Sequence, residues 1–412
     1  WMSDQLSEGD VILKVKQEDE ETGVSIIGMR LDDAVNLIKG PKDSKVTLTV
    51  KKKVLGNIEE ITITRDVVEI EETYAKVEKN GRVFGLINLP KFYFNMEDYS
   101  ERNAASDVKE EIIRLKKEGM EGLVLDLRNN GGGSLKTVVD IAGLFIEKGP
   151  IVQVKSKMEG QEILEDKDPS ILWDGPLVIL VNELSASASE ILAAAMQDYK
   201  RAIIIGSEQT YGKGTVQNVI DLNQTVRSNE YGDLGALKLT TQKFYRVNGG
   251  STQLEGVKSD VVVPDRYSYI DIGEKDYDNP LAWDQIKPAK YKVWDGYIDY
   301  DEVIKKSKQR MEANAQLSLI DENAQWVKKQ RDEEIYPLQY EAYYQQRTTS
   351  QEEAKKFNAI SKYTSNLSYT SLPYELELTE KDSTLKEKRV RWHKNLTSDV
   401  YIEEAINVLD DI

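Results

Sequence analysis

The chain has 412 residues, a formal net charge of −17, no cysteine and a single histidine, His393. The acidic balance argues against nonspecific binding to nucleic acid or to an anionic membrane surface. The lack of cysteine removes disulfides, thiolate nucleophiles and cysteine-ligated metals, and one histidine rules out a multi-histidine zinc site. No apolar run approaches the 18 residues of a membrane span. The length suits two or three domains, and we expect no metal and no cofactor.

Residues 1–67 predict a small α+β domain. Its expected elements are a strand at 11–15, a helix at 31–39, a strand at 45–51 and a strand at 61–64. This order resembles the second half of a PDZ domain, in which the helix walls a peptide groove. The candidate substrate-binding residues are therefore Leu31, Val35 and Ile38, which share one helical face. The glycine-containing loop that captures a C-terminal carboxylate is not found, so we expect an N-terminally truncated chain with a partial PDZ domain.

Residues 68–290 alternate strand with helix, which predicts an α/β core with a largely parallel sheet. The expected strands are 83–89, 122–127, 177–181, 202–205 and 215–222, and the expected helices are 105–117, 135–146 and 190–196. Residues 291–412 are charged and aromatic, with helical periodicity at 303–313 and 316–332. They predict a mostly helical C-terminal domain.

The chemistry centres on Ser187, which lies between an apolar strand and a helix rich in alanine and leucine. Ser187 and Glu190 also match an S-x-x-E capping box, so a purely structural serine explains this pattern equally well. Lys213 lies between two glycines, which allow the backbone to approach another element closely. Because the histidine lies far along the chain, lysine is the natural base for the serine. Gln217, four residues on, could orient the amine, although a lone glutamine is more often structural.

Two other motifs resemble known functional motifs, but the residues around them argue against these functions. Residues 206–215 resemble a phosphate-binding loop, but one residue too many separates the glycines, and Gly214 stands where serine or threonine would bind magnesium. A strand is expected after it instead of the required helix. Ser383 and Lys386 form a literal S-x-x-K, but they lie in a charged run without a buried strand or a glycine turn.

Several longer motifs together carry a family resemblance. They are Leu125–Gly133 (LDLRNNGGG), Ser185–Glu190 (SASASE), Gln197-Asp198, Gly212–Gln217 (GKGTVQ) and Phe244–Thr252 (FYRVNGGST). In this combination and order the chain resembles the C-terminal processing peptidases, most closely their tail-specific protease branch.

The resemblance implies a serine endopeptidase with a crotonase/ClpP-like core and an associated PDZ domain. It assigns Ser187 as nucleophile, Lys213 as base and Gln217 as the residue that holds the lysine. It also implies an oxyanion hole formed by the amides of Ala188 and of Gly132 or Gly133. Asp198 occupies a position where a structural carboxylate is expected.

The resemblance also implies the partners and the compartment. We expect unfolded or tail-bearing polypeptides as substrates, an adaptor lipoprotein as a further candidate partner, and a periplasmic location with any export signal ahead of Trp1. A noncatalytic PDZ-type peptide-binding module that retains the peptidase fold is the alternative. The presence of Ser187, Lys213 and Gln217 together favours the enzyme.

Overall fold

The computed structural model describes residues 6, 10–29, 31–52, 57–65, 73–95, 98–157, 160–226, 232–296 and 299–412. The chain divides into two compact units, Trp1–Ile70 and Glu71–Ile412, and each is described by itself. Among the described helices, none combines the length and the apolar character that crossing a bilayer would require.

The described residues of the first unit form a four-stranded antiparallel sheet and a helix. The strand order is β2 (Val24–Ser25), β1 (Val11–Gln17), β3 (Lys45–Lys51) and β4 (Ile58–Thr64), and the helix is α1 (Leu31–Ile38). Alternate residues of β3 point inward, and Val46, Leu48 and Val50 are buried with Val15 and Ile61. The expected strand–helix–strand order of the PDZ-like segment is therefore present.

The second unit is built on a seven-stranded sheet. In spatial order its strands are β14 (Val261–Val262), β11 (Ile203–Gly206), β10 (Leu177–Val181), β7 (Gly122–Asp126), β6 (Arg82–Asn88), β5 (Thr73–Lys79) and β15 (Ser368–Thr370). The first five are parallel, and β5 and β15 pair antiparallel at one edge. Strands β10 and β7 are buried along their whole length, as parallel strands covered on both faces should be.

One face of this sheet packs on α2 (Ala104–Lys117), α3 (Leu135–Gly143) and α4 (Ala188–Asp198). The core between them contains Leu125 and Ile179 of the sheet together with Ile112, Ile141 and Leu192 of the helices. Helix α3 ends at Gly143, three residues before the expected end. The glycine stretch 131–133 comes just before α3, and Ser187 comes just before α4.

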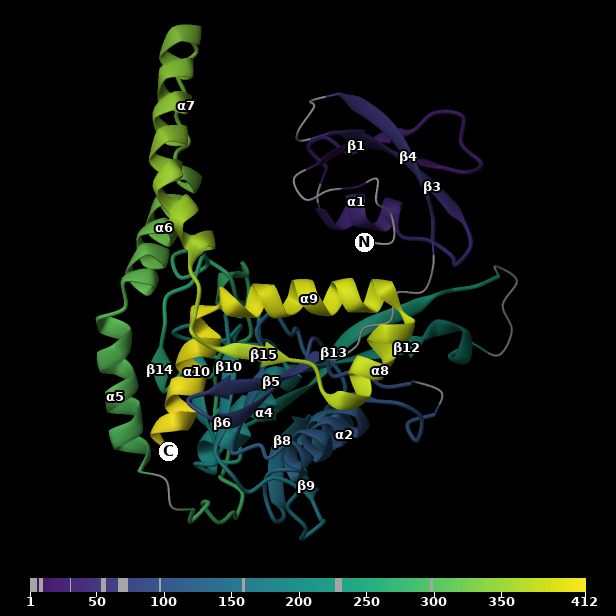
Figure 1. The fold of residues 1–412 in the computed structure, drawn as a ribbon. Helices are drawn as coiled ribbons and strands as arrows, with labels where there is room; N and C mark the ends of the chain where they lie inside the picture. Colours follow the sequence, from purple (N-terminus) through teal and green to yellow (C-terminus); the bar gives the residue numbers. More distant parts are fainter. Residues whose placement is uncertain are drawn as a thin grey trace. The chain divides into compact units, whose positions relative to one another are not determined.

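The opposite face is covered by the C-terminal part of the chain (Figure 1). Leu86, Val124 and Leu180 of the sheet pack with Ile402 and Ile406 of α10 (Val400–Asp411). The other helices of this region are α5 (Tyr300–Glu312), α6 (Ala315–Arg331), α7 (Tyr340–Lys355), α8 (Pro373–Lys381) and α9 (Ser383–Thr397), with a 3-10 turn at η3 (Lys356–Lys362). Two 3-10 turns, η1 (Leu222–Gln224) and η2 (Glu274–Asp276), come earlier in the chain.

A third sheet is antiparallel, in the order β12 (Thr215–Asp221), β13 (Ala236–Tyr245), β8 (Gly149–Ser156) and β9 (Gly160–Asp166). Strand β12 is an edge strand that begins two residues after Lys213.

The predicted α/β core with a largely parallel sheet and the predicted, mostly helical C-terminal region are confirmed. The division at residues 67 and 290 into three domains stays a prediction.

Candidate active site

Ser187 lies at the turn between β10 and α4, directly before the first helical residue. Its backbone has φ 58° and ψ −112°, a conformation that residues with a side chain rarely adopt. Such a conformation costs on the order of 1–3 kcal/mol, and it persists only where the surroundings enforce it. Strained non-glycine residues of this kind concentrate at catalytic turns, where they expose a side chain at a helix N-terminus.

The other two serines of the triplet are fully buried and hold this turn in place. Ser185 Oγ donates to the Leu127 carbonyl at 2.9 Å, and Ser189 Oγ donates to the Asn130 carbonyl at 2.8 Å. Both acceptors belong to the neighbouring strand–turn segment after β7. Hydrogen bonding therefore separates the structural serines from Ser187, which lines a cavity.

Lys213 reaches the same cavity from the loop between β11 and β12. Its Nζ lies 3.3 Å from Gln217 Oε1 and donates a hydrogen bond to it. Burial lowers the pKa of Lys213, and the positive charge of Lys238 lowers it further, whereas Glu274 and Glu190 act in the opposite direction. The side chain is thus displaced towards the neutral amine that a general base requires.

Gln217 lies beside an irregularity in the pairing of β12 with β13. Val216 pairs with Gln242 and Gln217 pairs with Thr240, so the extra residue of this bulge, Thr241, lies on β13. Among the described residues, Lys213 Nζ donates to Gln217 Oε1, and no hydrogen bond joins it to Ser187 Oγ. Catalytic hydrogen bonds often tighten only when substrate binds.

Glu190 connects the serine turn to the lysine loop. Its carboxylate is fully buried and accepts from the amide of Ser187 at 2.7 Å, which is the contact expected of a capping box. It also accepts from the amides of Gly212 and Lys213 and from Thr210 Oγ1, at 2.7, 3.0 and 2.7 Å. Burial raises the pKa of Glu190 to about 7, although all four donors favour the carboxylate.

The glycine turn after β7 lies directly against the serine. A Cβ on Gly132 would come within 2.8 Å of Ser187 Cβ and 3.0 Å of the Ala188 amide nitrogen. The N–H of Gly132 donates to Asn130 Oδ1 at 2.9 Å, so this amide is already engaged. Among the described residues, the amides of Ala188 and Gly133 have no acceptor, which leaves them available to an oxyanion.

All the predicted catalytic and oxyanion residues line one cavity of about 440 Å³. Ser187, Ala188, Lys213, Gln217 and the glycines at 131–133 form its polar side. The remaining lining residues are Pro90, Lys91, Leu135, Ile191, Thr215, Val216, Lys238 and Phe244. The apolar members provide a surface for a substrate side chain beside the reacting groups.

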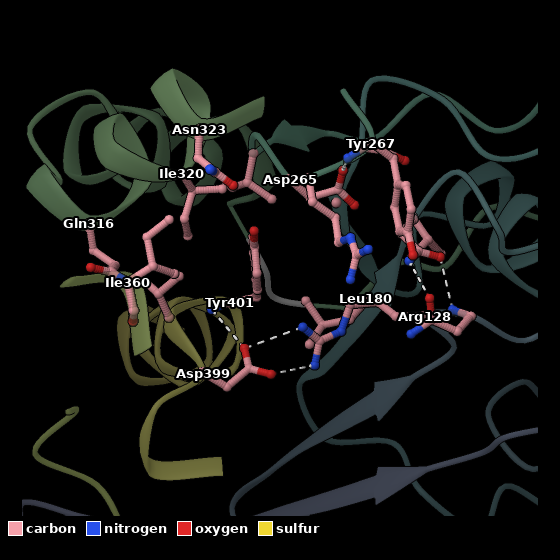
Figure 2. A pocket seen from close by; sticks show the side chains of 18 of the residues that line it. Arg128, Leu180, Asp265, Tyr267, Gln316, Ile320, Asn323, Ile360, Asp399 and Tyr401 are labelled. Carbon is pink, nitrogen blue, oxygen red and sulfur yellow. Dashed lines mark hydrogen bonds and ion pairs between the residues drawn. The ribbon is translucent and has the colours of Figure 1, made fainter. Parts of the chain in front are cut away.

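A larger cavity, of about 620 Å³, lies elsewhere, between the sheet and the C-terminal helices (Figure 2). It is lined by Arg128, Leu180, Ile320, Asp399 and Tyr401, among others, and it contains neither Ser187 nor Lys213. Size alone would favour it as a ligand site. The smaller cavity brings together the candidate nucleophile, the candidate base and the free amides, so it is the candidate site of the chemistry.

The other candidate residues have different surroundings. Asp198 is bound by Arg246 at 2.6 Å, in agreement with a structural role. In α1, Ile38 packs on the small core and Val35 is half-buried, while the side chain of Leu31 lies outside the described residues. The described residues contain no group of three or more His, Asp or Glu side chains placed to hold a metal ion.

Sequence reasoning missed three contributors to the site. They are the contacts of Glu190 with the lysine loop, the charge of Lys238, and the hydroxyl donor Thr210 in the lysine loop. Only the folded structure brings these groups together. Only the capping pattern hinted at Glu190, and it indicated only the contact with Ser187.

The chain was compared with protein-family models and with known proteins. The model of peptidase family S41 matches residues 83–263, and the model of the C-terminal domain of tail specific protease matches residues 267–412. Residues 83–263 therefore belong to peptidase family S41. Both the site residues and the C-terminal helices lie within the matched ranges.

The curated relatives agree with this assignment. The chain is 43% identical over 292 residues to the tail-specific protease of Haemophilus influenzae, a match that covers 70% of this chain and 40% of the relative. It is 33% identical over 296 residues to the carboxy-terminal processing protease CtpA of Bacillus subtilis, covering 69% and 57%. The chain thus spans about half the length of the curated relatives it matches.

Two solved structures are also similar. One is the photosystem II D1 C-terminal processing protease, with 30% identity, a TM-score of 0.42 and coverage of 62% of this chain and 63% of that chain. The other is the PDZ domain of a carboxy-terminal protease from Vibrio cholerae in complex with a peptide. It is 47% identical, with a TM-score of 0.16 and coverage of 17% of this chain and 70% of that chain.

Proposed function

We propose that this chain is a serine endopeptidase in which Ser187 is the nucleophile and Lys213 its general base. The observation that carries the proposal is the meeting of a strained serine, a lysine of lowered pKa and two free amides in one cavity. A noncatalytic peptide-binding module would have no need to maintain the backbone strain at Ser187.

The reaction follows from the positions of these groups. Ser187 Oγ attacks the peptide carbonyl carbon as its proton passes to Lys213 Nζ, and the amides of Ala188 and Gly133 bind the resulting oxyanion. The C–N bond then breaks, and the leaving amine takes the proton from the Lys213 ammonium. Water, deprotonated by the free Lys213 amine, attacks the ester carbonyl. The bond to Ser187 Oγ then breaks, Oγ takes the proton back from the Lys213 ammonium, and the carboxylic acid is released. Gln217 holds the amine between these steps.

The substrates that we propose are unfolded polypeptides selected through their C-terminal tails. The PDZ-like unit, with the apolar side chains of α1, supports this choice, as does the name of the Haemophilus relative. Leu31, Val35 and Ile38 are the groove residues in this proposal, and an adaptor lipoprotein is a further proposed partner. The proposed compartment is the periplasm, which cell fractionation tests.

Covalent labelling tests the proposal directly. A fluorophosphonate probe should modify Ser187 in the native chain, and peptide mapping should find the adduct on the peptide that contains Ser187. Denatured protein, in which the oxyanion amides and the base are dispersed, should not react. Modification of another serine with Ser187 intact would contradict the assignment.

The pH dependence should report the free amine of Lys213. We expect kcat/KM to rise with pH along an acid limb, because only the neutral amine accepts the serine proton. Lys238→Gln removes a positive charge, so the pKa of Lys213 should rise and the limb should move to higher pH. Glu274→Gln removes a negative charge and should move the limb to lower pH.

Lys238→Gln and Glu274→Gln are controls for each other, because each puts a neutral amide near Lys213 but the two remove charges of opposite sign. Added salt should shrink both displacements, because the charges interact partly through solvent. Shifts in the same direction for the two variants, or no shift in either, would show that a group other than Lys213 controls the limb.

A further inference from the structure

Arg128 joins the glycine turn to the C-terminal helices. Its guanidinium contacts Asp126 Oδ2 at 2.6 Å and Asp399 Oδ2 at 2.8 Å, and a second nitrogen reaches Asp399 Oδ1 at 3.2 Å. Figure 2 shows the Arg128–Asp399 pair on the wall of the larger cavity. The exposed fractions of the Arg128 and Asp399 side chains are 17% and 21%, so solvent screens the pair only in part.

Asp399 is also the N-cap of α10. Its Oδ1 accepts from the amides of Tyr401 and Ile402 at 3.0 and 3.1 Å. The start of α10, which covers one face of the sheet, is therefore fixed to the same carboxylate that holds Arg128.

On its other side, Arg128 continues into the oxyanion turn. The next residue, Asn129, exchanges hydrogen bonds of 2.8 and 2.9 Å with Asn182, which follows β10 and precedes the serine turn. Asn130 accepts from the amide of Ala186 through its carbonyl, and its side chain accepts from the amide of Gly132. A displacement of Arg128 would thus move both the glycine turn and the serine turn.

We propose that Asp399 is a positioning residue for the oxyanion hole and acts through Arg128. The C-terminal helices then form part of the catalytic apparatus, although the described residues of α5–α10 do not line the cavity of Ser187. The inference rests on the proposed peptidase function and deepens it.

Asp399→Ser tests this role. Serine is a good N-cap, so α10 keeps its start, but the shorter side chain loses Arg128. We expect kcat to fall about 10–100-fold with KM changed less than threefold, because the oxyanion amides act mainly in the transition state. A peptide aldehyde, which forms a tetrahedral adduct with the serine, should lose affinity by the same factor. Asp399→Asn, which keeps one acceptor for Arg128, should fall between the serine variant and the native chain.

Asp410 supplies a matched control at the opposite end of α10. It pairs with Arg82 and with Lys79, each at 2.8 Å, far along the helix from Asp399. Asp410→Asn should lower the melting temperature but leave kcat and aldehyde affinity unchanged. A variant that only loosens α10 is thereby separated from one that misplaces the oxyanion turn.

Hydrogen exchange gives a readout that does not need activity. Amides at 129–133 should exchange faster in Asp399→Ser than in the native chain, and they should be unchanged in Asp410→Asn. If native protein neither cleaves peptides nor binds the aldehyde, the proposed function fails, and exchange still decides the positioning role.

The positioning role is overturned if Asp399→Ser behaves like Asp410→Asn, with a lower melting temperature but native kcat, aldehyde affinity and exchange at 129–133. Should Asp399→Ser fail to fold, Arg128→Lys provides the same test, because lysine keeps the charge but cannot contact both carboxylates with a planar fork. Native kcat in a folded Arg128→Lys variant would equally overturn it.

Discussion

Replacing Ser187 by alanine is expected to lower kcat at least about 10⁴-fold, and Lys213→Ala should do the same. In the proposed mechanism, alanine removes the atom that bonds to the substrate carbonyl in the first variant and the proton acceptor in the second. Neither change disturbs a core, because both side chains face the cavity. The measurement is cleavage of an unfolded protein substrate, with the melting temperature of each variant to confirm folding.

The serine triplet provides the control. Ser189→Ala removes a buried hydroxyl that donates to the Asn130 carbonyl. It should cost about 1 kcal/mol of unfolding free energy and retain at least about a tenth of the native kcat, since this carbonyl also accepts from Ala186. A Ser187→Ala variant that is as active as Ser189→Ala would end the assignment of the nucleophile.

Glu190→Gln should damage stability and catalysis together. A glutamine has one acceptor atom where the carboxylate has two, so two of the four donors lose their partner in either orientation. Each buried donor left without an acceptor costs about 1–3 kcal/mol, so we expect about 3 kcal/mol less stability. The serine turn and the lysine loop are then no longer tied, and kcat should fall on the order of 100-fold.

Asp198→Asn is the comparison variant for Glu190, because it removes a carboxylate from the other end of the same helix. It weakens the pair with Arg246 and should lower the melting temperature while kcat stays close to native. Equal losses of kcat in the two variants would mean that the stability of α4, and not the link between the loops, accounts for the effect of Glu190.

Sequence reasoning identified residues whose roles are local. The turn before α4, the glycines around Lys213 and the capping pattern of Ser187 with Glu190 are spaced within a few positions, and the structure has these features in place. It did not reveal that the amide of Gly132 is engaged by Asn130, since a glycine-rich stretch does not specify which of its amides remain free.

Contacts between residues that are far apart in the chain could not be recognised from the sequence. Arg128 and Asp399 are 271 positions apart, and nothing in their neighbourhoods indicates the pair. The apolar strand 177–181 did imply cover on both faces of the sheet, but periodicity does not show which helices supply it. The sequence placed these helices after residue 290 but gave no sign that they pack on the sheet.

This cover sets an order of events during synthesis. The sheet contributes Arg82 early, and its partner Asp410 follows 328 residues later. At typical rates of translation, roughly 20–60 s separate the two residues. Until α10 emerges, this face of the sheet lacks Ile402 and Ile406, and Arg128 lacks Asp399. We therefore expect a chain that ends before α10 to lack the proposed peptidase activity.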